Sequence, residues 1–549
     1  MRQIYFDTRE GLQYNENDFY RNIFCKVKKE KLMLSHFYHF PSISQMPDIP
    51  PLPIPDYGHL TQTFRKELFN PKNNILRINP ENGHPIFGAY LQSDSNEMVT
   101  WGILAVGEYL TGNETDWITP TFEDFFSDPP GIFLNSPGHK RVEHWYLFYV
   151  NTLAGVIYQT LFPQDPCVRQ QMARSADTMA QMAKQLEYDF NSQGYDFSTN
   201  QPFTKKEIYR QPDSIAGYAY NMLFAALKAG RKEYLEQSVL AMRQYQAFPR
   251  NPWYEIPNGS AGLMSAVWLN THEYPMDIPK IAGWLFDTEE GPFQAGTWGE
   301  ECVDGLMMGW RGGTRREASD SAYSMESLMP LQFILPAVRY EPRLAKPVAK
   351  YVLNALSSFQ LFYARGRNKL YETKPDLSPS IPYERIMKEL EGHVPAACGD
   401  FWGHRSVYGA GYLCWMEAIA QRTQDRNIIA LDLSLTDWLA EESLPVYLLR
   451  NPYSYPVAVQ FSPAAIWQKK CPELLWEGHY NLDIYRLEDQ NLIAQGTSEI
   501  ALTLEPDEVT LLAAVPSGSQ VYKSKGFFKC GKAELVYYTD MVIGKDRSK

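Results

Sequence analysis

The sequence lacks a long uninterrupted hydrophobic run. Charged residues break every apolar stretch before it reaches the ~18 residues that a membrane-spanning helix needs. The N-terminus, MRQIYFDTREGLQYNENDFY, also carries charges where a secretory signal peptide would have its apolar core. These absences predict a soluble, cytoplasmic protein that is not inserted in a membrane.

Cysteines are few and scattered. The chain has 7 of them and no C-x-x-C pair, which argues against both a disulfide framework and a zinc knuckle. The G-x-x-x-x-G-K-[ST] phosphate loop, the G-x-G-x-x-G dinucleotide fingerprint and the G-x-S-x-G elbow are absent as well. Kinases, Rossmann dehydrogenases and α/β-hydrolases are therefore disfavoured, and we predict neither a cofactor nor a metal site.

Positive charge is also scarce. Lys and Arg together number 52 against 64 Asp and Glu, so the net charge is −12, and no long basic run is present. A protein that binds nucleic acid needs a basic stripe to neutralise phosphates. We therefore expect no nucleic-acid partner.

Aromatic residues, in contrast, are abundant. They make up 14% of the 549 residues, with 13 Trp and 35 Tyr, and many lie in polar segments such as NPWYEIPNGS and CGDFWGHRSVYGAG. Rings in such segments often offer a flat apolar face and a polar edge to a ligand, although large domains also bury many aromatics. Trp253, Trp402 and Tyr408 are candidate substrate-binding residues on this basis.

Helical periodicity dominates from about residue 90 to residue 440. Segment 166–187 has one apolar stripe and one polar face, as expected for an outer helix. Segments that are apolar nearly all round alternate with amphipathic ones, which predicts helical hairpins in two concentric rings. The predicted pairs are 213–229 with 232–247, 319–340 with 343–361, and 402–423 with 426–440, and Pro330 and Pro336 predict a kink or an early end within 319–340.

The pattern changes to period two after residue 443. Ile500, Leu502 and Leu504 alternate with less apolar residues, as in half-buried antiparallel strands. We predict three regions: an extended, Pro-rich N-terminal segment (1–85) that packs on the barrel, a helical catalytic domain (86–443) and a C-terminal β-sandwich-like domain (444–549). A chain of this length is expected to form more than one structural unit.

Helical hairpins, polar aromatic loops before the inner helices and a C-terminal β-domain together resemble the six-hairpin glycosidase-like superfamily. The resemblance is architectural, covers most of the chain and includes no diagnostic family motif. It implies a mainly α fold, an (α/α)6 toroid, with a cleft where the inner helices begin, lined by carboxylates and aromatic rings.

Acidic residues recur in the loops that lead into the predicted inner helices. An Asp in this position often only caps its helix, but a ring of inner helices would direct all of these ends at one cavity. The residues are Asp94, Glu97, Asp213, Asp320 and Asp400.

Glycoside hydrolysis requires two carboxyl groups, one as proton donor and one ionised. The leading hypothesis is a glycoside hydrolase acting on an oligosaccharide, with uronate-containing ones among the candidates. Its acid is expected among Asp213, Glu301 and Asp320, and its base among the others or Asp400.

The densest candidate segment is 289–320, which combines carboxylates, glycines, tryptophans and arginines. A guanidinium fork fits a uronate carboxylate, but pairing with neighbouring acids is an equal alternative. The candidate substrate-binding residues in this segment are Trp298, Trp310, Arg311 and Arg315.

Two other functions remain open. His404 and Tyr408, together with Arg405, form a set suited to proton abstraction beside a uronate carboxylate, as in a polysaccharide or oligosaccharide lyase. A lone His beside aromatics is, however, more often structural. The second alternative is a non-catalytic toroid that binds carbohydrate.

Overall fold

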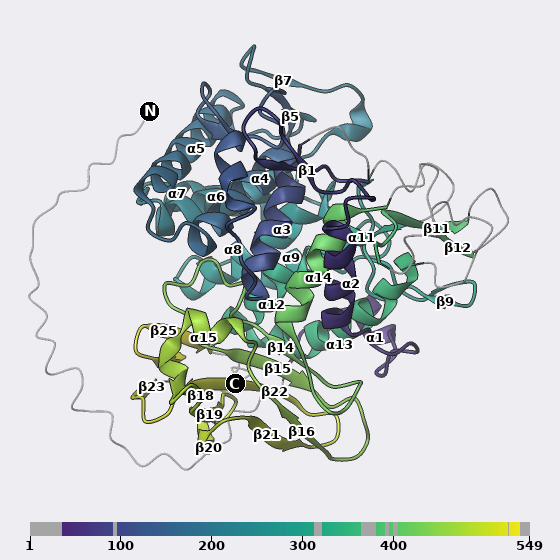
Figure 1. Cartoon of the computed structure of the whole chain (residues 1–549), viewed down its shortest axis with the longest axis vertical. Coiled ribbons are helices and arrows are strands. Elements are labelled where there is room, and N and C mark those ends of the chain that lie inside the picture. The colour runs from purple at the N-terminus through teal and green to yellow at the C-terminus, as the bar shows by residue number, and fades with distance from the viewer. Residues whose placement is uncertain are drawn as a thin grey trace, which may run out of the picture.

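The computed structural model describes residues 36–91, 96–311, 321–363, 380–389, 395–398, 405–524 and 526–538. A helix-rich part is followed by a strand-rich C-terminal part that lies beside it (Figure 1). The prediction of a mainly helical chain that ends in strands is therefore confirmed. In the described ranges, no helix has the length and apolarity needed to cross a membrane.

A set of buried helices forms the centre of the helical part. Neighbouring helices contact each other in the order α3, α4, α6, α8 and α12. Helix α11, which precedes α12 in the chain, contacts α14, and α14 contacts α3. Their contacts thus follow the order of a ring. The bounds are α3 (Met98–Leu110), α4 (His144–Thr160), α6 (Ser214–Lys228), α8 (Ile256–Thr271), α11 (Ser324–Leu328), α12 (Leu331–Tyr340) and α14 (Val407–Ile419).

A second set of helices packs on the outside of this ring. Each contacts one or two inner helices, and α5 buries Val168, Met172 and Met179 on its apolar stripe, as predicted. The outer helices are α2 (Tyr57–Leu68), α5 (Pro166–Gln185), α7 (Tyr234–Gln246), α9 (Ile278–Leu285) and α13 (Ala345–Ser358). The predicted interruption within 319–340 is confirmed at Pro330, because α11 ends before it and α12 begins after it, whereas Pro336 lies inside α12.

Glycines set the spacing between inner helices. A Cβ on Gly107 of α3 would lie 2.8 Å from the Cβ of Cys414 in α14, and one on Gly262 of α8 would lie 2.8 Å from the Cβ of Ala216 in α6. Any larger residue at these positions would force the helices apart. Apolar, glycine-containing segments of the sequence therefore form close contacts between inner helices.

The N-terminal segment lies along α13 after the short helix α1 (Pro41–Gln45). Polar side chains of α13 and of the turn after it donate to its carbonyls, including Ser357 Oγ to the Leu52 oxygen at 2.6 Å and Gln360 Nε2 to the Pro53 oxygen at 3.0 Å. These bonds satisfy backbone acceptors that the prolines leave without helical or strand partners.

A six-stranded antiparallel sheet forms the centre of the C-terminal part. Its order is β13 (Ala420–Arg422), β14 (Ile429–Asp432), β15 (Val446–Arg450), β22 (Val509–Pro516), β19 (Leu482–Arg486) and β20 (Asn491–Thr497). The sheet thus begins upstream of residue 443. Its smaller neighbours are β16 (Val457–Phe461) with β21 (Ile500–Leu504), β17 (Leu475–Trp476) with β18 (His479–Tyr480), β23 (Val521–Lys523) with β24 (Phe527–Cys530) and β25 (Ala533–Tyr537), and the short helix α15 (Ile466–Lys470).

One predicted helix is wrong. Segment 426–440 contains strand β14, whose four residues are all buried between β13 and β15. A short apolar run buried on both faces of a sheet has no alternation, so its pattern does not differ from that of a buried helix.

Short antiparallel sheets of two or three strands lie in the segments between the helices. They are β1 (Arg77–Ile78) with β2 (Pro85–Ile86), β3 (Phe126–Ser127) with β4 (Ile132–Phe133), β5 (Arg141–Glu143) with β6 (Gly194–Asp196) and β7 (Gln201–Phe203), β8 (Thr297–Trp298) with β9 (Glu301–Cys302), and β10 (Ser321–Tyr323) with β11 (Arg385–Glu389) and β12 (Pro395–Cys398).

Candidate active site

Carboxylates mark the N-terminal ends of the inner helices. Glu97, Glu143, Asp213 and Glu255 occupy the N-cap positions of α3, α4, α6 and α8, and Glu326 lies in the first turn of α11. In the described part of the chain, none of the four N-cap side chains accepts a hydrogen bond from its own helix. Helix capping therefore does not explain why these positions are acidic.

Glu255 and Glu326 are both buried, each with 4% of its surface exposed, and Asp213 is fully buried. Burial raises the pKa of Glu255 well above its ordinary value, and the charges of Glu326 and Glu143 raise it further. Burial likewise raises the pKa of Glu326, and the charge of Glu384 adds to the effect. Both groups are therefore harder to ionise than an ordinary glutamate.

Glu384 receives a hydrogen bond from a tyrosine. The Tyr408 hydroxyl donates to Glu384 Oε1 at 2.7 Å, and Tyr90 Oη lies 3.0 Å from Tyr408 Oη. The chain reaches this position because β11 pairs with β10, so that the Ser324 N–H donates to the Glu384 carbonyl at 2.9 Å. This pairing brings Glu384 to the start of α11.

Two amides fix Glu143. Its carboxylate oxygens accept from Gln193 Nε2 at 2.9 Å and from Gln211 Nε2 at 2.8 Å, while Gln211 in turn accepts from the Trp145 N–H. Unlike Glu255 and Glu326, Glu143 is only partly buried. The arrangement holds an oriented acceptor at the start of α4.

Asp213 lies at the start of α6, as the sequence predicts, and connects it to α8. Its Oδ2 accepts from the backbone N–H groups of Tyr254 at 2.9 Å and Glu255 at 3.1 Å. Burial raises the pKa of Asp213 to about 7, and the two N–H groups lower it in part. Asp213 thereby fixes the backbone that carries Glu255.

Three further sequence candidates surround the loop before α8. Arg311 Nη1 donates to the carbonyls of Asn251 at 3.1 Å and Trp253 at 3.3 Å. Trp310 forms a backbone bridge with Glu255, and its ring centroid lies 5.6 Å from that of Tyr209. The structure therefore brings Asp213, Trp253, Trp310 and Arg311 together beside Glu255.

The remaining candidate site residues from the sequence lie in the β8–β9 hairpin or outside the residues that the structure describes. Glu301 and Trp298 face each other in the β8–β9 hairpin, where Trp298 packs into the hydrophobic core. Asp94, Arg315, Asp320, Asp400, Trp402 and His404 lie outside the described residues. Across the described ranges, no group of three or more His, Cys, Asp or Glu side chains is placed to hold a metal ion.

Sequence reasoning missed Glu143, Glu255, Glu326 and Glu384. The rule that selected Asp213, an acid just before an apolar helix, also applies to Glu143 and Glu255. Glu326 lies one turn inside its helix, and Glu384 precedes a strand that was not predicted. Only the β10–β11 pairing brings these two together.

The chain matches no known protein family, and no characterised protein matches its sequence. Solved structures with some similarity include a sugar epimerase from a ruminal bacterium (12% identity, 65% of this chain and 98% of that chain, TM-score 0.38). A family 76 glycoside hydrolase from Bacteroides thetaiotaomicron aligns over 66% of this chain and 77% of its own (10% identity, TM-score 0.41). A cellobiose 2-epimerase from Spirochaeta thermophila aligns over 66% and 96% (11% identity, TM-score 0.39). TM-scores at this level assign neither a family nor a function to the chain.

Proposed function

We propose that the chain is a carbohydrate-active enzyme built on an (α/α)6 toroid. It hydrolyses a glycosidic bond at the acid cluster, which consists of Glu143, Asp213, Glu255, Glu326 and Glu384. The observation that carries this proposal is the pair formed by Glu326 and Glu384. One carboxyl is buried and has a raised pKa, and the other interacts with it and accepts a tyrosine hydrogen bond. The ring order of the inner helices supports the toroid.

The pair supplies the two groups that glycoside hydrolysis requires. Glu326 donates its proton to the glycosidic oxygen as the bond from that oxygen to the anomeric carbon breaks. Glu384 is the ionised partner, because a hydroxyl that donates to a carboxylate favours its charged form. It either takes a proton from the attacking water or attacks the anomeric carbon itself.

Glu255, Glu143 and Asp213 act beside this pair. The fixed carboxylate of Glu143 accepts from a sugar hydroxyl, and Glu255, whose pKa is raised, is a second candidate proton donor. Asp213 is a positioning residue, because it holds the Glu255 backbone. Asp320, Asp400, Glu301 and His404 stay predictions for further catalytic roles.

The lyase alternative has less support. A tyrosine that abstracts a proton needs a lowered pKa, whereas burial and the charge of Glu384 raise the pKa of Tyr408 well above its ordinary value. Tyr408 also uses its proton to hydrogen-bond Glu384.

The test incubates the purified protein with neutral and uronate-containing oligosaccharides and follows three products: new reducing ends, unsaturated uronates and epimerised sugars. The variants are Glu326→Gln and Glu384→Gln, with the exposed Glu289→Gln as control. New reducing ends that fall by about 10²-fold or more in both variants, and stay unchanged in the control, support the proposal.

Other outcomes overturn it. Unsaturated uronates would establish the lyase, and epimerised sugars without new reducing ends would establish an isomerising enzyme. Oligosaccharide binding without any product would establish a binding protein.

A further inference from the structure

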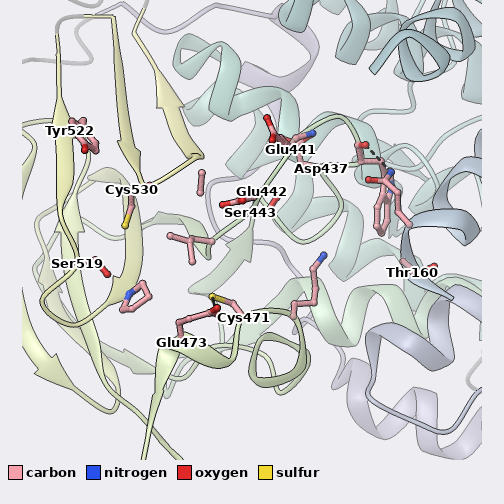
Figure 2. Close-up of a pocket in the computed structure, with 18 of the residues that line it drawn as sticks. Thr160, Asp437, Glu441, Glu442, Ser443, Cys471, Glu473, Ser519, Tyr522 and Cys530 are labelled. Carbon is pink, nitrogen blue, oxygen red and sulfur yellow. Dashed lines mark hydrogen bonds between the residues drawn. The ribbon is translucent and has the colours of Figure 1, made fainter. Parts of the chain in front are cut away.

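The structure contains a large cavity far from the acid cluster. Its volume is about 740 Å³, and its walls come from the ends of α3 and α4, from residues 437–444, from the end of α15 and from the C-terminal strands. Figure 2 shows Thr160 on one side, Tyr522 and Cys530 on the strands opposite, and Glu473 below. The cavity lies at the C-terminal end of the 17-residue helix α4, whereas Glu143 lies at its N-terminal end, about 25 Å away at 1.5 Å per residue.

Lys470 places a side-chain ammonium group on the cavity wall. Its Nζ lies 5.7 Å from the ring centre of Trp438 and 5.4 Å from that of Trp467. Over the ranges that the structure covers, Lys470 forms no ion pair and no hydrogen bond, and the Trp438 indole N–H has no acceptor. The buried Trp438 indole N–H thus lacks an acceptor, and the partly exposed Lys470 lines the same cavity.

The carboxylates of Asp432 and Asp437, near Lys470, accept hydrogen bonds from other groups. Asp437 accepts from Arg339 Nη1 at 2.7 Å and from Tyr340 Oη at 2.9 Å. Asp432 accepts from Trp467 Nε1 at 2.6 Å and from two backbone N–H groups.

Two further cations lie near these carboxylates. Lys228 donates to the Ala440 carbonyl, and burial lowers its pKa while the charges of Asp437 and Glu441 raise it in part. Arg339 pairs with Asp437. Burial lowers the pKa of Lys470 to about 8, while Asp432 and Asp437 raise it in part. Of these three cations, Lys470 is the one that lines the cavity.

The other carboxylates of the cavity lie in solvent. The side chains of Glu441 and Glu442 are 78% and 53% exposed and lie 3.5 and 3.7 Å from Lys532. Glu473 is also exposed. Water and salt screen such exposed charges.

We infer that this cavity is a second ligand site, which binds a small organic anion with its carboxylate or phosphate oxygens on Lys470 and its body against Trp438 and Tyr109. The volume lies in the range of small-molecule sites, about 300 to 1,000 Å³. The site is independent of the catalytic proposal, because the two share no residue.

Calorimetry on the full-length protein at pH 7 and low salt tests the inference with glucuronate, glucose 6-phosphate, inorganic phosphate and neutral glucose. We expect at least one anion to bind and glucose not to bind. Whether glucuronate or glucose 6-phosphate binds with the higher affinity then shows whether the site prefers a carboxylate or a phosphate. Lys470→Gln weakens this binding by about tenfold or more, the loss expected for a charge-assisted hydrogen bond. Lys184→Gln, on the exposed face of α5, leaves it unchanged.

Two further measurements do not depend on the folding of Lys470→Gln. Glucuronate affinity of the wild type falls steadily above about pH 8 as Lys470 loses its proton. Glu442→Gln strengthens anion binding at low salt, since it removes a negative charge from the cavity wall. Absence of anion binding to the wild type, equal binding of glucose, or a flat pH profile would overturn the inference.

Discussion

Neighbouring carboxyls in the acid cluster differ because their hydrogen bonds differ. Asp213 and Glu255 are both buried, but two backbone N–H groups donate to Asp213 and hold its pKa at about 7. Burial and the surrounding carboxylates raise the pKa of Glu255 well above its ordinary value. Donors to a carboxylate thus decide which acid ionises first.

Asp213 makes the stability of the protein depend on pH. Its pKa is about 7 in the folded state against 3.8 for the free group, so its contribution to stability is greatest below about pH 4 and is lost as pH rises through about 7. This loss amounts to up to about 4 kcal/mol. Asp213→Asn keeps an oxygen for both N–H groups and cannot ionise, so its stability relative to the wild type rises between pH 5 and pH 8.

Urea unfolding at both pH values measures this difference. Asp165→Asn, which changes the N-cap of α5 near the surface, is the control and is expected to show no such trend. A stability difference between Asp213→Asn and the wild type that is the same at both pH values would contradict the assignment.

Tyr408 is expected to set the ionisation of Glu384. Tyr408→Phe removes the donor at 2.7 Å, so Glu384 becomes a weaker acid and the acidic limb of the kcat/KM profile moves to higher pH. The profile is measured on the oligosaccharide that the wild type cleaves. The exposed Tyr522→Phe leaves the limb in place, and a limb that does not move in Tyr408→Phe either would show that the hydrogen bond has no role in the reaction.

Among the elements, the inner helices depend on small residues at their contacts. A Cβ at Gly262 would approach the Cβ of Ala216 to 2.8 Å, and neither atom can rotate away because both are fixed to the backbone. Gly262→Ala therefore forces α6 and α8 apart and is expected to lower the free energy of unfolding by about 1–3 kcal/mol. Thermal unfolding measures this loss.

Gly283 in α9 gives the matched control. Nothing lies within 4 Å of a Cβ placed there, so Gly283→Ala is expected to stabilise the helix by up to about 1 kcal/mol. If both variants shifted the melting temperature in the same direction, the inner helices would not be as closely packed as the structure indicates.

Elements with a clear exposed face were predictable from the sequence. The stripe of Val168, Met172 and Met179 predicted α5, and Ile500 and Leu504 marked β21, because one face of each element meets water. Strand β14 was mistaken for a helix because all of its residues are buried, which removes the periodic signal.

In the whole molecule, a buried ion pair joins the helical part to the C-terminal strands. Arg339 of α12 is 1% exposed, pairs with Asp437 at 2.7 Å and donates to the backbone carbonyls of Glu534 and Leu535 in β25. Arg339→Met leaves the Asp437 charge buried and unpaired. It is expected to lower the free energy of unfolding by about 3–5 kcal/mol.

Urea unfolding followed by tryptophan fluorescence and by circular dichroism measures this loss. The solvated pair of Arg174 and Asp128 provides the control, since Arg174→Met is expected to leave the unfolding midpoint unchanged. Restoring neutrality with Asp437→Asn in the Arg339→Met background recovers part of the stability. Equal effects of Arg339→Met and Arg174→Met would show that the buried pair does not join the two parts.

The sequence by itself determined the class of fold, helices followed by strands, because hydrophobic periodicity depends on local geometry. It also indicated that acids gather where inner helices begin, and Asp213 confirms that position. Only the tertiary structure brought Glu326 to Glu384 and Lys470 to Trp438, because these pairs are joined by strand pairing and packing between distant segments. A side chain's pKa and its partners depend on burial and on neighbours in space, which residue spacing along the chain does not specify.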